Sequence, residues 1–207
     1  MTQIRCFDIS QLQPGDYDEL YSKSSPERKQ RADRYLRKED SVRCVVAGAL
    51  MHLLPGFAQE DLDRTPDGKP YLKNREKLHF NLSHSGRWVV IAWGDSPLGI
   101  DVEQISLDPG KEQVARRFFR SDEQAYIFAA EGETRARRLF RVWTMKESYL
   151  KYLGTGINRP LNSFSALGDR LGVTLSSEYL PDACLTLCAS DDVMNCRMLT
   201  PGQLLAV

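Results

Sequence analysis

The order of periodic patterns along the chain constrains the fold most strongly. Apolar residues spaced for a helix alternate with short β-branched or alternating runs that are typical of strands. The predicted segments are a strand at 4–9, a helical stretch at 25–54, strands at 78–83, 88–93 and 98–102, helices at 114–119, from 121 and at 133–153, and strands at 171–175, 185–189 and 196–199. Helices are thus followed by strands twice. We therefore predict an α+β fold of two halves, 1–100 and 101–207, which join near residues 100–108.

Short signals mark where the predicted helices begin and end. Ser25 precedes a proline and an acid, which is typical of a helix N-terminus. The helix that starts there is expected to break near Lys38 and to stop at Pro55-Gly56. Ser121 to Gln124 resembles a capping box. Gly154 is positioned to end the long helix predicted at 133–153.

Composition excludes several functional classes. The chain has 207 residues, with 28 basic and 28 acidic side chains, so its overall charge gives no reason to expect nucleic-acid binding. No run of about 18 apolar residues predicts a membrane span. The first residues lack the apolar region of a secretory signal. We expect a cytoplasmic protein without nucleic-acid or membrane partners.

Five cysteines are scattered along the chain at positions 6, 44, 184, 188 and 196. An odd number in a chain without a signal predicts reduced thiols. Cys184, Cys188 and Cys196 have no histidine near them in sequence, and residues 184–188 alternate like a strand. We therefore predict buried structural thiols rather than a metal cluster.

Two carboxylates follow Gly99 in a predicted strand. Alternate side chains of a strand share a face and lie about 7 Å apart, so Asp101 and Glu103 can reach one cation or a water bound to it. Taken alone, the pattern is more typical of an exposed strand end.

The long helix supplies further polar groups at helical spacing. Trp143, Glu147 and Lys151 follow one another at intervals of four residues and share one side of the helix. Taken alone, Glu147 and Lys151 would be a surface pair. Together with Asp101 and Glu103 they suit a hard cation acting on a phosphate, because Mg²⁺ prefers oxygen ligands and binds through carboxylates and substrate phosphates.

Basic groups and one histidine are candidates for binding phosphates. Arg28 and Arg31 lie one turn apart within a basic stretch at 23–43, and a guanidinium matches phosphate oxygens well. His84 stands at a strand end beside a glycine turn, and Lys69 lies in a loop. A solvated helix face and a solvated turn remain the alternatives for these residues.

These segments together resemble the Sfp-type 4′-phosphopantetheinyl transferases, a family that activates peptide and polyketide synthases. The resemblance is carried by Gly99-Ile100-Asp101-Val102-Glu103 and by Trp143-Thr144-Met145-Lys146-Glu147-Ser148-Tyr149-Leu150-Lys151. Gly68-Lys69-Pro70 and Phe80-Asn81-Leu82-Ser83-His84-Ser85 add to it upstream. The match covers nearly the whole chain and is sharpest between Ser25 and Thr155.

The resemblance implies a single-chain pseudo-dimer of two similar α+β halves, with the active site in the cleft between them, that works as a monomer. It implies transfer of 4′-phosphopantetheine from coenzyme A to a serine of an acyl or peptidyl carrier protein, with release of 3′,5′-ADP. The product would serve polyketide, nonribosomal peptide or fatty acid synthesis.

The resemblance also implies roles for individual residues. Metal binding falls to Asp101, Glu103 and Glu147, which would hold Mg²⁺, and catalysis to Glu147 and Lys151. Coenzyme A contacts fall to Arg28, Arg31, Lys69, Ser83, His84 and Lys151. At Arg28 and Arg31 the family often has lysine, and at Cys44 a hydroxyl residue that contacts the 3′-phosphate. The base that deprotonates the carrier serine is Glu147 or a metal-bound water that it orients.

Two other functions are compatible with the same residues. One is a binding module that holds coenzyme A or docks carrier proteins without catalysis. The other is a metal-dependent phosphohydrolase that acts on nucleotides. The sequence does not indicate which carrier protein is modified, whether acylated coenzyme A is accepted as a donor, or what the oligomeric state is.

Overall fold

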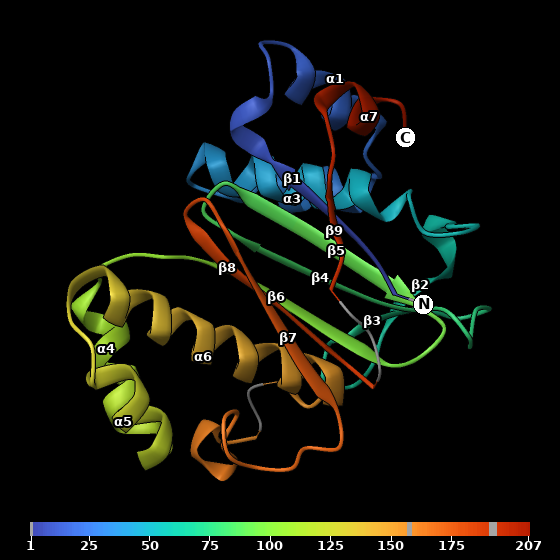
Figure 1. Ribbon diagram of the computed structural model, residues 1–207. Coiled ribbons are helices and arrows are strands. Elements are labelled where there is room, and N and C mark those ends of the chain that lie inside the picture. The colour runs from blue at the N-terminus through green and yellow to red at the C-terminus, as the bar shows by residue number, and fades with distance from the viewer. Residues whose placement is uncertain (1, 157–158, 191–193) are drawn as a thin grey trace.

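The computed structural model describes residues 2–156, 159–190 and 194–207 and shows a mixed α+β fold (Figure 1). The first part contains β1 (Gln3–Asp8), η1 (Ile9–Gln11), α1 (Asp16–Lys23), α2 (Pro26–Asp33), α3 (Lys38–Met51), η2 (Gln59–Asp61), β2 (Leu62–Arg64), β3 (Pro70–Leu72), β4 (His79–Ser85) and β5 (Trp88–Gly94). The second contains β6 (Leu98–Gln104), α4 (Pro109–Phe118), α5 (Ser121–Phe128), α6 (Gly132–Leu153), η4 (Leu161–Ser163), β7 (Thr174–Leu180), β8 (Ala183–Ala189), β9 (Cys196–Met198) and α7 (Pro201–Leu205).

Two sheets form the centre of the molecule. One has the order β4-β5-β1-β9 and the other the order β6-β8-β7, while β2 and β3 form a separate hairpin. Among the described strands every pair is antiparallel except β1 with β9, which run parallel. Figure 1 shows α3 on one side of the strands and α6 on the other. The sheet of β9 therefore combines strands from both ends of the described chain.

The strands alternate their side chains between two apolar layers. In β5, Val89 and Ile91 pack in a cluster with α3, whereas Val90 and Ala92 pack in a second cluster with Ile100 of β6 and residues of β8. Burial on both faces explains why β5 reads as a continuous apolar run. The order of layers is helix, sheet, sheet, helix. The predicted boundary at residue 100 falls inside β6.

Most helix signals in the sequence correspond to real ends, but α3 ends at Met51 rather than at the predicted stop at Pro55-Gly56. The side chain of Ser25 accepts a hydrogen bond from the amide of Arg28, and the predicted break falls at 34–37, between α2 and α3. Before α5 the carboxylate of Glu123 accepts a hydrogen bond from the amide of Arg120, one residue before the predicted cap at Ser121, so only the glutamate half of a capping box forms. Gly154, at φ 73°, ends α6 in the left-handed region, where glycine is favoured.

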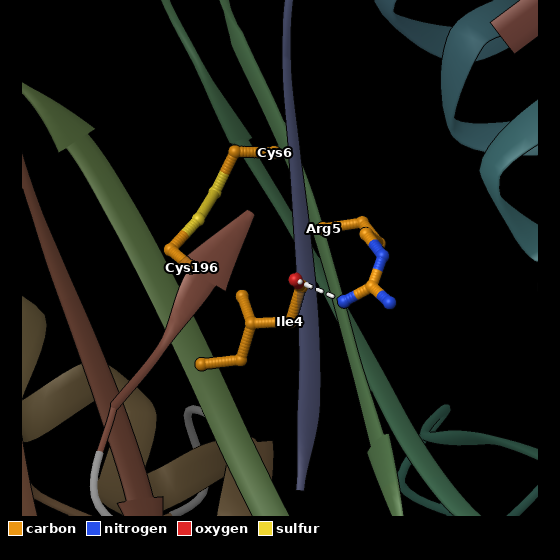
Figure 2. Close-up of a disulfide and its surroundings, with 4 residues drawn as sticks. All are labelled: Ile4, Arg5, Cys6 and Cys196. Carbon is orange, nitrogen blue, oxygen red and sulfur yellow. Dashed lines mark hydrogen bonds between the residues drawn. A yellow bond between two sulfur atoms is a disulfide. The ribbon is translucent and has the colours of Figure 1, made fainter. Parts of the chain in front are cut away.

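One cysteine prediction is wrong. Cys6 and Cys196 form a disulfide that joins β1 to β9, with their Cα atoms 6.4 Å apart (Figure 2). The pairing arises because β9 lies parallel beside β1, a contact between segments that are 190 residues apart. Cys44, Cys184 and Cys188 are free thiols, as predicted, and the predicted burial holds for Cys184 and Cys188; Cys44 is buried as well.

No helix within residues 2–156, 159–190 and 194–207 has the length and apolar character needed to cross a membrane.

Candidate active site

A cavity of about 490 Å³ contains most of the residues selected from the sequence. Its polar lining combines carboxylates, cations and one imidazole: Asp101, Glu103, Glu147, Lys151, Arg28, Arg31, Arg64, Ser83 and His84. Its remaining lining is largely apolar and includes Tyr35, Cys44, Ala47, Met51, Leu62, Pro70, Leu82 and Trp143. The lining comes from α2, α3, β2, β3, β4, β6 and α6, so segments from both sheets and both long helices build one site.

The alternation of β6 directs its two carboxylates toward α6. Leu98, Ile100 and Val102 pack between the sheets, and the intervening positions face the helix. Gly99 lies directly against that helix: a Cβ atom there would lie 2.1 Å from the carbonyl oxygen of Ser148. Glycine at this position therefore allows the carboxylate-bearing strand to approach α6 closely.

Asp101 is the most constrained group of the site. Its Oδ1 accepts hydrogen bonds from Lys151 Nζ at 2.7 Å and from Ser83 Oγ at 2.8 Å. The side chain is only 5 % exposed, and its Oδ2 is buried without a hydrogen-bond partner. A buried carboxylate oxygen without a partner is costly, so this atom is available to a ligand that enters the cavity.

Side chains of β4 connect this strand to β6 where no backbone ladder joins them. Asn81 Oδ1 accepts from the amide of Ile100, and Ser83 Oγ accepts from the amide of Val102. Ser85 Oγ accepts from the next alternate amide, Gln104, and donates to Glu103 Oε2 at 2.9 Å. The strand thus orients both carboxylates of β6 while it joins the two sheets.

The carboxyl groups of Glu147 and Glu103 are both partly buried and both feel the negative charge of Asp101. Burial and then the charge of Asp101 raise the pKa of both carboxyl groups above their ordinary value. Lys151, whose ammonium also contacts the carbonyl oxygen of Ile100, offsets part of that rise. Within the described residues no group of three or more His, Cys, Asp or Glu side chains is arranged to hold a metal ion by itself.

The cations of α2 differ in how firmly they are held. Arg28 donates from Nη1 to the carbonyl oxygen of Cys44 at 3.4 Å, and its side chain packs over Gly48. Arg31 is exposed at the cavity. His84 is also exposed there, and desolvation, followed by the charges of Arg43 and Lys151, lowers the pKa of its imidazole.

Lys69 occupies a different position from the other predicted residues. Its ammonium donates to three backbone carbonyl oxygens, of Lys151, Tyr152 and Leu98, and the side chain does not line the cavity. Pro70, the next residue, does line it.

Sequence reasoning overlooked one cation of the lining, Arg64. Arg64 lies in the short strand β2 and donates to the carbonyl oxygen of Gly68 at 2.8 Å. A three-residue strand gives almost no periodic signal, so this arginine had no recognisable context. Trp143, which shares a side of α6 with Glu147 and Lys151, lines the cavity with them, and the centre of its ring lies 4.0 Å from the ammonium of Lys111.

Comparisons with known proteins point to one family. The family described as "4′-phosphopantetheinyl transferase superfamily" matches residues 97–193, and that described as "4′-phosphopantetheinyl transferase, N-terminal" matches residues 13–95. A 4′-phosphopantetheinyl transferase of Bacillus subtilis is 34% identical over 161 residues, which are 74% of this chain and 70% of that protein. The 4′-phosphopantetheinyl transferase psf-1 of Bacillus pumilus is 35% identical over 170 residues, or 75% and 72% of the two chains. The 4′-phosphopantetheinyl transferase Sfp of Bacillus subtilis (strain 168) is 34% identical over 148 residues, or 68% and 65%. Sequence motifs, cavity and relatives agree, and the chain belongs to the Sfp-type 4′-phosphopantetheinyl transferase family.

Proposed function

We propose that this protein transfers the 4′-phosphopantetheine group of coenzyme A to a serine of an acyl or peptidyl carrier protein and releases 3′,5′-ADP. The observation that carries the proposal is the buried, unpartnered Oδ2 of Asp101, in a cavity that also holds Lys151, Arg28, Arg31 and His84. Carboxylates beside several cations suit a substrate with a pyrophosphate and a further phosphate.

The donor set of the cavity fits Mg²⁺. Asp101, Glu103 and Glu147 offer oxygen atoms only, and one of these atoms is buried without a partner. Mg²⁺ commonly takes one or two carboxylates and completes its shell with waters and substrate phosphates, so a closed cage of protein ligands is not needed. We propose that these three residues hold the ion. When bound, it would neutralise the pyrophosphate and the charge that develops on the leaving oxygen.

The side chains of the cavity suit the other tasks of this reaction. Arg28 and Arg31 would bind the phosphates of coenzyme A, and His84 would donate a hydrogen bond to one of them. Lys151 would add positive charge beside the pyrophosphate while it holds Oδ1 of Asp101. Glu147, directly or through a water, would accept the proton of the carrier serine at a carboxylate oxygen.

The cavity also supports the idea of a pseudo-dimer that acts as a monomer. Residues from α2 and β4 and residues from β6 and α6 line it together in one chain. No second copy is needed to complete the lining. We place this activity in the cytoplasm, where carrier proteins for polyketide, nonribosomal peptide or fatty acid synthesis would be the acceptors.

Asp101→Asn tests the proposed function. The substitution keeps the side chain's shape but removes the charge that faces Lys151, and we expect transfer to fall by at least about 100-fold. The assay incubates an apo carrier protein with coenzyme A and Mg²⁺ and measures the intact mass of the carrier. Glu76→Gln, at an exposed position outside the cavity, is the control and should keep full activity.

The same assay separates the other two functions. Binding of coenzyme A by calorimetry without any mass gain on a panel of carriers would support a binding module. Release of phosphate from coenzyme A without a carrier would support a phosphohydrolase. Full transfer by Asp101→Asn would contradict the metal assignment, provided that its melting curve matches that of the wild type.

A further inference from the structure

Lys69 reaches across the molecule to the end of α6. Its Nζ lies 2.6 Å from the carbonyl oxygen of Lys151, 3.2 Å from that of Tyr152 and 3.3 Å from that of Leu98. An ammonium group has three protons to donate, so three carbonyl oxygens account for all of them. The side chain is half-buried, and its charge has no hydrogen-bonding capacity left for a ligand in this arrangement.

The three acceptor carbonyl groups lie at the end of a helix and at the start of a strand. Lys151 and Tyr152 lie in the last turn of α6, and the final carbonyl groups of a helix have no partner within the helix. The negative end of the helix dipole also favours a cation there. Leu98 begins β6, the strand that carries Asp101. Lys69 therefore fastens the end of α6 to the start of β6.

The loop that carries Lys69 is itself held firmly. The amide of Thr65 donates to the carbonyl oxygen of Lys69 at 2.9 Å, and the amide of Lys69 donates back to Thr65 Oγ1 at 3.1 Å. The stem of Lys69 packs beside Gly154, where a Cβ atom would lie 3.4 Å from its Cδ. Both ends of the lysine are thus fixed, which makes it suited to hold a neighbour in place.

The neighbour it holds is a residue of the proposed catalytic site. The carbonyl oxygen of Lys151 accepts from Lys69, and the ammonium of Lys151 lies 2.7 Å from Asp101 Oδ1 and 3.0 Å from Ser83 Oγ. Building on the proposed function, we infer that Lys69 is a positioning residue: it fixes the last turn of α6 so that Lys151 stays on Asp101, and it does not contact the nucleotide.

The two roles for Lys69 leave opposite kinetic signatures. Loss of a nucleotide contact weakens coenzyme A binding and leaves kcat largely unchanged. Loss of a positioning contact leaves binding nearly unchanged but misplaces Lys151, and a shift of about 1 Å in a catalytic group can reduce the rate on the order of 100-fold. Hydrogen exchange adds a readout that needs no catalysis, because a loosened helix end exchanges its amides faster.

The experiment compares Lys69→Met with Lys73→Met. Lys73 is an exposed lysine of the same segment that pairs with Asp63, outside both the cavity and the α6 contact. For Lys69→Met we expect kcat to fall about 10- to 100-fold, with the Kd for coenzyme A within about threefold of the wild-type value and faster exchange over residues 149–156. Lys73→Met should match the wild type in all three measurements.

Gly154→Ala is a second route to the same helix end. Its φ of 73° disfavours alanine, and the new methyl group would contact the stem of Lys69 without removing any charge. We expect the same loss of kcat without a loss of affinity. This variant keeps the inference testable if Lys69→Met does not fold.

The results separate the inference from the function on which it rests. A rise of tenfold or more in Kd for coenzyme A with unchanged kcat, or unchanged exchange at residues 149–156, would overturn the positioning role. Absence of transfer by the wild type itself would contradict the proposed function instead. The affinity and exchange measurements would then still decide whether Lys69 fixes the helix end or binds the nucleotide.

Discussion

Adjacent residues of the helical motif have opposite surroundings. Glu147 lines the cavity, whereas Lys146 is fully buried on another side of α6 and lies 2.8 Å from Glu123. Lys146 Nζ also donates to the carbonyl oxygens of Leu161 and Phe164, both at 2.7 Å. The neighbouring Lys and Glu thus have separate roles, since successive residues of a helix point about 100° apart. Lys146 stabilises the fold beneath α6, and Glu147 faces the cavity.

Lys146→Met should be strongly destabilising, because it leaves the carboxylate of Glu123 buried without its charge partner. We expect a loss of about 3–5 kcal/mol in the free energy of unfolding, measured by urea denaturation. The double variant Lys146→Met with Glu123→Leu should recover much of that loss, since no buried charge remains. Equal losses in the single and double variants would show that the hydrogen bonds to Leu161 and Phe164, rather than the ion pair, are responsible.

The exposed guanidinium of Arg31 should contribute to coenzyme A binding more than to catalysis. A hydrogen bond to a charged group is worth roughly 1.5–3 kcal/mol, so Arg31→Ala should raise the KM for coenzyme A about 10-fold or more, with the KM for the carrier protein within about twofold. Steady-state kinetics with each substrate varied in turn measures both values. Arg34→Ala, an exposed arginine outside the cavity, is the control. An unchanged KM for coenzyme A would remove Arg31 from the binding site.

At the scale of elements, the site depends on how closely β6 approaches α6. The packing of this strand on this helix sets the distance between the carboxylates of one and Glu147 and Lys151 of the other. Gly99 is the residue that permits the approach, because the nearest atoms to a Cβ there belong to the backbone of α6 and cannot rotate away.

Gly99→Ala should separate the two elements. Its Cβ would lie 2.1 Å from the carbonyl oxygen of Ser148 and 2.4 Å from the amide nitrogen of Tyr152. We expect a loss of about 1–3 kcal/mol in the free energy of unfolding, together with a loss of transfer. Chemical denaturation and the carrier-mass assay measure the two effects. Gly202→Ala, where no atom lies within 4 Å of the new Cβ, should change neither, and a fully active, stable Gly99→Ala would contradict the packing argument.

Element boundaries were predictable where a local signal fixed them. Ser25 and Gly154 have their effect within one helical turn, so their sequence context was sufficient. The hairpin of β2 and β3 has strands of three residues, which show no period, and α1 lacks a side-chain cap at its Gly15 N-terminus. The residues of the site show the same contrast between local signals and tertiary contacts. Asp101 and Glu147 were found from patterns, whereas the reach of Lys69 to α6 depends on tertiary contacts that no local pattern contains.

At the scale of the whole molecule, the sheets join distant segments in ways the sequence does not display. The parallel pairing of β1 with β9 places Cys6 beside Cys196, and only this arrangement makes the disulfide possible. Counting cysteines led to the opposite prediction because the count contains no information on which strands become neighbours. The buried thiols were predictable, since an alternating apolar strand such as 184–188 already implies burial.

Thiol titration checks this arrangement. The native protein should react slowly with an aromatic disulfide reagent, because Cys44, Cys184 and Cys188 are buried and burial raises the pKa of Cys188 to about 12. Denaturation without a reductant should expose three thiols, and denaturation after reduction should expose five. Five reactive thiols before reduction would show that Cys6 and Cys196 are not bonded. Cys196→Ser, which cannot form the disulfide with Cys6, is the control for the bonded pair.

Strand β9 is synthesised long after β1, the strand that it pairs with, and this order matters for folding during synthesis. The sheet that contains β4, β5 and β1 receives its fourth strand from residues 196–198, about a hundred residues after β5 ends. During synthesis the outer edge of β1 therefore emerges from the ribosome long before its partner does. An unpaired strand edge can add strands from other chains, so the growing polypeptide carries an open edge that the segments following β5 cannot close. Release of β9 from the ribosomal tunnel is the event that closes it.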